Sequence, residues 1–335
     1  MLWLPPAALP WRRAFAARLE TGAVPAALSY LPEKLYSRLA ARRIARPLTL
    51  PARANIVGIG SAVLGGAGKT PTCIAWALAL ARTGARVAVV AHGYRARTSI
   101  VRRVEPSAPV AQVGDDSLVL ARALAPFGVP VWVGPDRSAT LDQAAASADV
   151  VLIDGLLQSC PRRLDHAVLV LDASAPWGSG HCLPRGDLRA PPEALRAASD
   201  ELVVVTDPER DGAGLCPELS AVRRATLRME GFSERAGMRS LEQARNARLG
   251  LLLLVARPQR IRSSLACRGI RLACEWLGAD HHPPTTRELL QLERLARRHR
   301  LDAWLVTPKC RTHLSSEPGA PLWTIETRVR LDPNL

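Results

Sequence analysis

Residues 64–71 read LGGAGKTP, and their types and spacing indicate phosphate chemistry. This glycine-rich segment follows the apolar run 54–59 and precedes a stretch with the length and composition of a helix, 71–82. In such a loop, backbone N–H groups at a helix start face the anion, a lysine reaches the terminal phosphates, and a threonine hydroxyl can bind Mg²⁺. The expected nucleotide-binding residues are Gly65, Gly66, Ala67, Gly68, Lys69, Thr70 and Pro71.

Lysine usage supports this interpretation. Of 45 basic residues only three are lysines, namely Lys34, Lys69 and Lys309. Because arginine fills nearly every other basic position, a lysine in the loop indicates a need for a compact, flexible ammonium. The strict loop pattern has a glycine five residues before Gly68, where this chain has Val63. An ordinary glycine turn is therefore the alternative.

Carboxylates follow two predicted elements. Asp154 ends the apolar run 150–153, where an acid can hold Mg²⁺, although an Asp-Gly turn is the competing interpretation. Asp115 and Asp116 precede a predicted helix, 117–124. Acids at a helix start are commonly simple caps, whereas near a nucleotide they become candidates for base and metal contact. The segment 280–282 reads Asp-His-His, a poor metal spacing, yet a histidine there could orient a catalytic carboxylate.

The apolar runs that position these residues alternate with helical segments. This order predicts an α/β fold with a parallel sheet covered by helices on both faces, of the P-loop NTPase kind. A second α/β unit begins near 249–256, after a possible crossing strand at 225–229. We expect N-terminal amphipathic helices in 1–50, a P-loop domain in 51–220 and a smaller α/β domain in 221–335. The other expected strands are 86–91, 129–133, 167–171, 201–206 and 303–307, with a further helix at 139–147.

Residues 1–50 mix apolar and aromatic side chains with arginines. We expect short helices broken at Pro25 and Pro32, apolar on one side and arginine-rich on the other. Such helices suit a membrane interface, and packing on the protein's own core is the alternative.

Composition narrows the function class. The 335 residues are enough for two domains, and a hydrophobic content of 48% excludes disorder. A net charge of +15 suggests nucleic acid, an anionic membrane or a phosphorylated substrate as partner, unless it only reflects the arginine-rich composition. Aromatic residues, at 4%, are too few for a single-strand nucleic-acid platform. Seven cysteines without a CxxC pair argue for a reducing compartment and against a zinc site. The chain has no apolar run of eighteen residues and no signal-peptide pattern.

Eight ordered segments resemble motifs of the tetraacyldisaccharide 4'-kinase (lipid A 4'-kinase) family. The phosphate loop and Leu183–Arg189 (LPRGDLR) carry the resemblance most directly. The other segments are AHGY at 91–94, VGDDS at 113–117, Val133 to Arg137, ARPQR at 256–260, DHH at 280–282 and TPKC at 307–310.

The resemblance implies transfer of the γ-phosphate of ATP to the 4'-hydroxyl of a tetraacyldisaccharide 1-phosphate, with Mg²⁺. It implies Lys69 on the phosphates, Asp115 as catalytic base and His281 paired with it. The implied metal ligands are Thr70, Asp154 and Asp116, and the implied substrate contacts are Arg137, Arg189 and Gln158. A lipid acceptor places the enzyme peripherally at the anionic cytoplasmic face of the inner membrane, with no nucleic acid and no obligate protein partner.

This chain also departs from the family pattern. The family's D-D-G-x-Q-H motif corresponds to residues 154–159, where Gly155 replaces the second acid and Ser159 the histidine. Further differences are Val63, His92, Asp116, Pro308 and Cys310. The chain is therefore a divergent member, and a catalytically impaired nucleotide-binding relative or a P-loop kinase for another acceptor are the alternatives.

Overall fold

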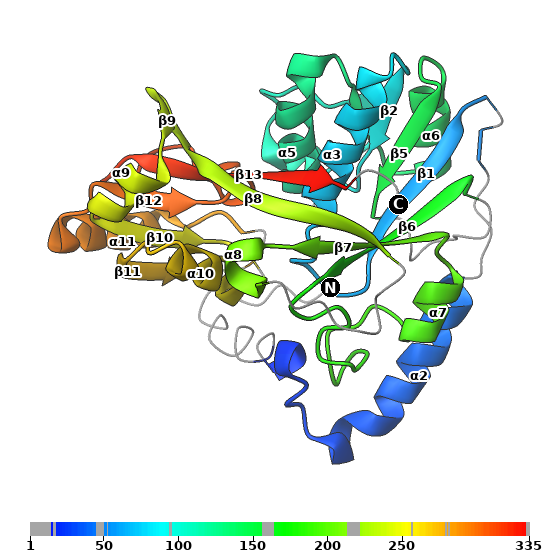
Figure 1. The fold of residues 1–335 in the computed structure, drawn as a ribbon, viewed down its shortest axis with the longest axis horizontal. Coiled ribbons are helices and arrows are strands. Elements are labelled where there is room, and N and C mark those ends of the chain that lie inside the picture. Colours follow the sequence, from blue (N-terminus) through cyan, green and yellow to red (C-terminus); the bar gives the residue numbers. More distant parts are fainter. Residues whose placement is uncertain are drawn as a thin grey trace.

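A computed structural model describes residues 15, 18–44, 50–51, 53–93, 96–155, 164–212, 222–255, 257–278, 280 and 282–332. The strands of this part join into one sheet (Figure 1). They are β1 Asn55–Ser61, β2 Val87–Val90, β3 Arg102–Arg103, β4 Val131–Val133, β5 Val150–Asp154, β6 His166–Asp172, β7 Glu201–Thr206, β8 Arg223–Glu234, β9 Gly237–Arg239, β10 Leu249–Leu253, β11 Leu272–Leu277, β12 Ala303–Val306 and β13 Leu322–Leu331. Their order is β11-β10-β12-β13-β8-β7-β6-β1-β5-β2-β4-β3, and β9 pairs with β8.

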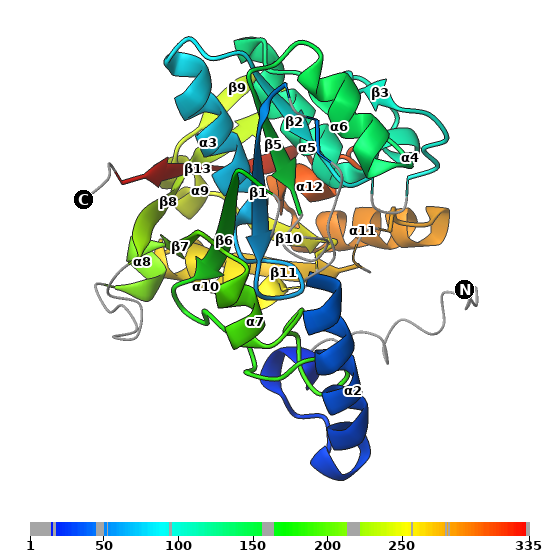
Figure 2. The same cartoon turned by 90° about the vertical axis from the view of Figure 1, so that its right-hand side faces the viewer.

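Helices flank this sheet (Figures 1 and 2). They are α2 Ala26–Ile44, α3 Lys69–Arg82, α4 Val110–Val113, α5 Asp115–Leu124, the 3₁₀ helix η2 Ala125–Phe127, α6 Arg137–Ala145, α7 Pro192–Ala197, α8 Pro208–Asp211, α9 Leu241–Asn246, α10 Pro258–Cys267, α11 Thr286–His299 and α12 Pro308–Arg311. The predicted α/β class is confirmed. Helix α3 begins at Lys69 rather than 71, because Gly68 adopts the left-handed conformation and caps it, while Pro71 fits a first helical turn.

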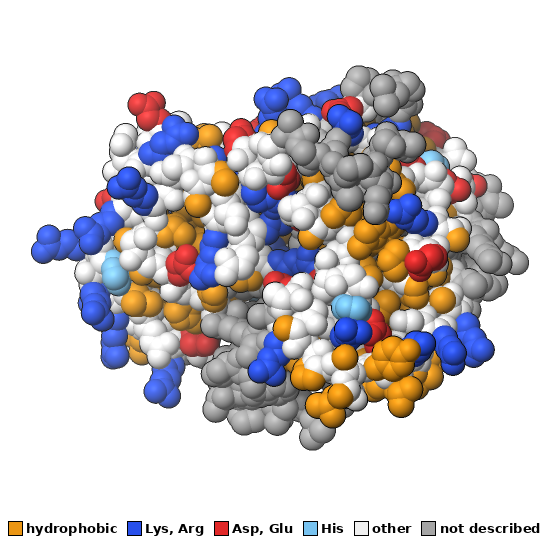
Figure 3. All heavy atoms as spheres, turned by 60° about the horizontal axis from the view of Figure 1, so that its bottom comes forward, with side chains coloured by type: hydrophobic (Ala, Val, Ile, Leu, Met, Phe, Trp, Pro, Cys, Tyr) orange, Lys and Arg blue, Asp and Glu red, His pale blue; other side chains and the backbone are white. Residues whose placement is uncertain are grey.

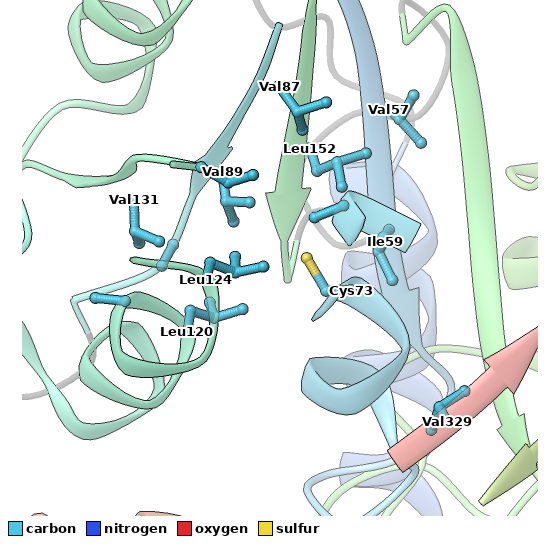
Figure 4. Close-up of a cluster of buried hydrophobic side chains, with 14 of the residues drawn as sticks. Val57, Ile59, Cys73, Val87, Val89, Leu120, Leu124, Val131, Leu152 and Val329 are labelled. Atoms are coloured by element: carbon cyan, nitrogen blue, oxygen red, sulfur yellow. The ribbon is translucent and has the colours of Figure 1, made fainter. Parts of the chain in front are cut away.

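The strands β7-β6-β1-β5-β2-β4 run parallel and are apolar on both faces. On one face Val57 and Ile59 pack with side chains of α3 and α5 (Figure 4). On the opposite face Ile56 and Ile153 pack with α6, beside Leu141. Strands buried on both sides explain why the sequence shows continuous apolar runs here.

The sheet is mixed rather than wholly parallel. Strand β8 pairs antiparallel with β13, and β3 and β9 also pair antiparallel with their neighbours. The expected strand at 225–229 is one part of β8, which is twelve residues long and partly exposed. Val329 of β13 packs in the same core as Val57 and Ile59. The second core, around β10 and β12, has Trp304 and Phe232 buried within it. The division of the chain near residue 220 stays a prediction.

Helix α2 corrects one expectation. It continues through Pro32 instead of breaking there, although a proline inside a helix removes one hydrogen bond at a cost of about 3 kcal/mol. Contacts along one side hold the helix. The Tyr36 hydroxyl donates to the Arg189 carbonyl oxygen at 3.1 Å, and Glu33 accepts from the Cys182 N–H at 3.1 Å. Of the expected helices before Pro25, only Phe15 and residues from 18 onward lie in the described part.

The other side of α2 is apolar and exposed. Four leucines at helical spacing are between 51% and 79% exposed: Leu28, Leu31, Leu35 and Leu39. On the docked side Ile44 is buried, and Tyr36 and Ala40 pack against the same core. The helix therefore has two apolar sides, one docked and one open, rather than the single one expected. Figure 3 shows hydrophobic side chains beside Lys and Arg on the lower side of the molecule, where α2 lies. None of the described helices combines the length and hydrophobicity that crossing a membrane requires.

Candidate active site

The phosphate loop connects β1 to α3 and has the backbone expected of an anion cradle. Gly65, Gly66 and Gly68 have φ values of 75°, 72° and 83°. A side chain at these angles is strained, so glycine is required there. Val63 is buried and forms an isolated bridge with Leu188. Its side chain thus belongs to the core, which explains how the loop tolerates an apolar residue at this position.

Lys69, Thr70 and Asp154 form one cluster at the ends of neighbouring parallel strands. Ile59 of β1 is paired in register with Asp154 of β5. The Lys69 ammonium contacts Asp154 Oδ1, and Thr70 Oγ1 donates to Asp154 Oδ2 at 3.0 Å. Asp154 is 2% exposed and Lys69 19%. The carboxylate predicted from an apolar strand end therefore lies against the loop.

Asp115 is a buried carboxylate held from two directions. It begins α5 after Gly114, whose φ is 87°, and its side chain is 2% exposed. Its Oδ1 accepts from the Asp116 N–H at 2.9 Å, and its Oδ2 lies 2.9 Å from His313 Nε2. His313 is 198 positions away in the chain. The structure thus joins the two halves of the molecule at this carboxylate.

Lys309 of α12 adds a cation to the same acids. Its Nζ lies 3.3 Å from Asp116 Oδ1 and 4.0 Å from Asp115 Oδ2. Burial alone would lower the pKa of Lys309, but Asp116, Asp115 and Asp280 together raise it above its ordinary value. Lys309 is therefore a charged ammonium at neutral pH. It holds Asp116, whose predicted role was metal binding.

Arginines surround the cluster. Arg137 begins α6, and its Nη1 is buried without a hydrogen-bond partner in the described chain. Burial lowers the pKa of Arg137, and the negative charge of Asp154 opposes that shift. Arg189 donates from Nε to the Val63 carbonyl oxygen at 2.8 Å, which fixes it beside the loop. Both predicted arginines thus lie near the phosphate loop and its carboxylate.

The pKa of His92 reflects the positive charge of this region. Partial desolvation lowers the pKa of His92, as do the nearby Arg137, Lys69 and Arg189, while Asp116 raises it. The imidazole is therefore neutral at pH 7. Figure 3 shows Lys and Arg side chains in the hollow at the centre of the face it displays. The predicted Gln158 and His281 lie outside the described residues.

Three side chains that sequence reasoning did not assign take part. His313 and Lys309 contact the acids of α5, and Arg257 covers the loop. A Cβ added at Gly66 would meet Arg257 Cδ at 2.9 Å, and the Arg257 guanidinium pairs with Asp187. The rarity of lysine was an available signal for Lys309, whereas nothing local marks His313.

The donors fit ATP and Mg²⁺. Hard oxygen ligands suit Mg²⁺, which usually retains water and phosphate oxygens as further ligands. Thr70 Oγ1 and the Asp154 carboxylate supply two such oxygens side by side. Within the described ranges no group of three or more His, Cys, Asp or Glu side chains could hold a metal by itself. A site shared with a nucleotide is consistent with this donor set.

Known proteins resemble this chain over most of its length. The family model for tetraacyldisaccharide-1-P 4'-kinase (LpxK) matches residues 26–335. A tetraacyldisaccharide 4'-kinase of Anaeromyxobacter dehalogenans (strain 2CP-C) is 35% identical, covering 94% of this chain and 83% of the relative. Its counterpart from Methylobacterium sp. (strain 4-46) is 35% identical over 90% of this chain and 87% of that protein. The solved structure of LpxK from Aquifex aeolicus in complex with ATP has a TM-score of 0.64 at 19% identity, covering 91% of this chain and 93% of that one, and it confirms the fold.

Proposed function

The chain belongs to the tetraacyldisaccharide-1-P 4'-kinase family, and from this premise we propose how its side chains act. The protein is an ATP-dependent kinase of lipid A biosynthesis, acting on the 4'-hydroxyl of a tetraacyldisaccharide 1-phosphate. One observation carries the assignment of roles. The phosphate loop and Asp154 meet at one end of the parallel strands, while buried Asp115 is held there by His313.

The nucleotide would bind to the loop 65–71. Its amides and the start of α3 would face the phosphates, and Lys69 would exchange Asp154 for β- and γ-phosphate oxygens. Arg137 has a buried nitrogen without a partner and could donate it to a phosphate oxygen. Arg189 would add a second guanidinium next to the loop. Phosphoryl transfer depends chiefly on such positioning and charge neutralisation.

Thr70 and Asp154 would hold Mg²⁺. Asp116 would be a further ligand after it gives up its ion pair with Lys309. Bound Mg²⁺ neutralises phosphate charge during transfer. The paired oxygens of Thr70 and Asp154 support this assignment. Asp116 is the weaker part of the set because its observed partner is Lys309.

Asp115 would act as the general base. The 4'-oxygen would bond to the γ-phosphorus as the bond to the β–γ bridging oxygen breaks and ADP leaves, and the hydroxyl proton would pass to the carboxylate. His313 would orient Asp115 from the C-terminal half. The predicted roles of His281 and Gln158 remain proposals based on the family pattern.

The enzyme would work at the cytoplasmic face of the inner membrane as a peripheral protein. An acceptor with several acyl chains stays in a bilayer, so the kinase must reach the surface. The exposed leucines of α2 can enter the acyl boundary, and nearby basic residues of the same helix can contact anionic headgroups: Lys34, Arg38, Arg42 and Arg43.

The test is a transfer assay with labelled ATP, Mg²⁺ and the tetraacyldisaccharide 1-phosphate in mixed micelles. We expect a bisphosphorylated lipid from the wild type and at least a hundredfold less from Lys69→Ala. Asp115→Asn should lower kcat by about 10²- to 10⁴-fold, the usual contribution of a general base, with little change in KM for ATP. Arg224→Ala, at an exposed position of β8 with no assigned role, serves as the control for loss of a cation. Equal rates for Asp115→Asn and wild type would refute the base assignment.

A further inference from the structure

A cavity of about 530 Å³ lies behind Asp115, between α4 and α5 on one side and the segment after α12 on the other. Eleven residues line it, among them Arg122, Arg311 and His313, and none of the eleven is acidic. The remaining wall is largely apolar and includes Pro109, Val110, Leu118 and Pro283. The cavity is therefore cationic with apolar sides.

Both arginines are held by backbone carbonyl oxygens, and the described residues offer them no acidic partner. Arg122 donates from Nε to the Pro106 carbonyl oxygen at 3.0 Å, and Arg311 donates from Nη1 to the Leu314 carbonyl oxygen at 2.6 Å. Neither guanidinium forms a salt bridge within the described part of the chain. Partial desolvation and then the positive charge of Arg311 lower the pKa of Arg122. An anion between the two cations would relieve this repulsion.

His313 connects the cavity to the catalytic carboxylate. Its side chain is 6% exposed, and its Nε2 is engaged by Asp115. Its Nδ1 is buried and has no hydrogen-bond partner among the residues described. A buried polar atom without a partner is costly, so a ligand atom that bonds to Nδ1 would be favoured.

We propose that this cavity binds the 1-phosphate of the acceptor disaccharide. The inference rests on the proposed function, because it names where the acceptor's own anion lies. That phosphate is carried on the sugar ring next to the one that is phosphorylated. An anion site separated from the catalytic carboxylate by a single imidazole ring suits this arrangement, and the apolar wall can pack against the sugar. The phosphate would accept hydrogen bonds from both guanidiniums and would bring a polar atom within reach of His313 Nδ1.

The decisive experiment compares two acceptors, the tetraacyldisaccharide with and without its 1-phosphate, in the mixed-micelle assay. The variant is Arg122→Gln with Arg311→Gln. We expect its KM for the 1-phosphate acceptor to rise at least 30-fold, about 2 kcal/mol at 1.4 kcal/mol per tenfold, with kcat within threefold of wild type. With the acceptor that lacks the phosphate, variant and wild type should have equal KM values.

Two controls separate the loss of the cavity arginines from a general loss of positive charge. Arg97→Gln with Arg103→Gln removes two exposed arginines outside the cavity and should leave both KM values unchanged. Arg122→Lys with Arg311→Lys keeps the charge and should recover part of the affinity.

Inorganic phosphate distinguishes the source of the anion. In the wild type it should compete with the 1-phosphate acceptor, raising its KM and leaving kcat unchanged. If phosphate instead changes kcat with both acceptors, the cavity is an effector site and the proposal fails. An equal KM increase with both acceptors in the glutamine variant also overturns it. A wild type that phosphorylates neither acceptor would instead refute the proposed function.

Discussion

Replacing His313 with leucine tests whether the contact between the two halves of the molecule orients the catalytic base. The change removes the imidazole that meets Asp115 Oδ2 at 2.9 Å and keeps an apolar side chain of similar size. The buried carboxylate then retains the Asp116 N–H at 2.9 Å and the Lys309 ammonium at 4.0 Å. Its Oδ2 has then lost the contact with the imidazole.

The expected cost follows from these contacts. A hydrogen bond to a charged group contributes roughly 1.5–3 kcal/mol, and the remaining partners limit the loss. We expect the free energy of unfolding to fall by about 2 kcal/mol, roughly a 30-fold change in the unfolding equilibrium. This corresponds to a decrease in Tm of about 3 °C for a chain of this size. Because the base is no longer held in place, kcat should fall by about 10- to 100-fold.

The assay measures kcat and the KM for ATP together with thermal unfolding. KM for ATP should stay within twofold of wild type, since the phosphate loop has its own contacts with Asp154. His313→Gln, whose amide N–H can donate to the same oxygen, should recover most of the activity. His299→Leu, at the end of α11, is the matched control. If His313→Leu lowers Tm while kcat stays within threefold of wild type, His313 stabilises the fold only, and the orientation argument is wrong.

Three other perturbations have defined outcomes. Gly66→Ala should raise KM for ATP at least tenfold, because a left-handed backbone costs an alanine about 1–2 kcal/mol and the new Cβ would lie 2.9 Å from Arg257 Cδ. Gly84 also has a positive φ, but a Cβ there would have no atom within 4 Å. Gly84→Ala therefore controls for the cost of the backbone conformation when ATP binding is titrated. Three exposed leucines of α2, Leu28, Leu31 and Leu35, can be replaced together with serine. The affinity for anionic vesicles, measured by co-sedimentation, should fall about 100-fold while ATP turnover without lipid stays constant. Unchanged vesicle binding would exclude α2 as the anchor. Because the pKa of Lys309 is raised in the folded state, its contribution to stability is complete below about pH 10.4 and is lost as the pH rises through the folded value. The difference in unfolding free energy between wild type and Lys309→Met should thus be constant from pH 8 to 10 and shrink above that, and a difference that already shrinks at pH 8 would contradict the ion-pair assignment.

Local pattern was sufficient for the nucleotide half of the site. The loop glycines, Lys69 and the acid after an apolar strand are readable one segment at a time, and parallel pairing brings the ends of β1 and β5 together. The sequence alone did not show why the loop tolerates Val63 in place of the usual glycine. In the structure the reason is that Val63 is buried.

The contacts around the proposed base, Asp115, could not be predicted in the same way. The contact between Asp115 and His313 spans 198 positions, and periodicity carries no information about such pairs. In the second half of strand β13 only Val329 is buried, and the strand lacks a continuous apolar run. Its role became visible only through its partner β8. Helix α11 was missed although Thr285 and Glu288 form a capping box that the sequence displays.

The position of β13 in the chain sets the order in which a working enzyme can be made. Val329 completes the core beside β1 and α3, yet it is translated more than 240 residues after the phosphate loop. Until β13 has been translated, the nucleotide-binding half therefore exposes an unfinished sheet edge along β8. A chain terminated before β13 would keep this edge unpaired, so it would be a substrate for chaperones and proteases rather than a partly active kinase.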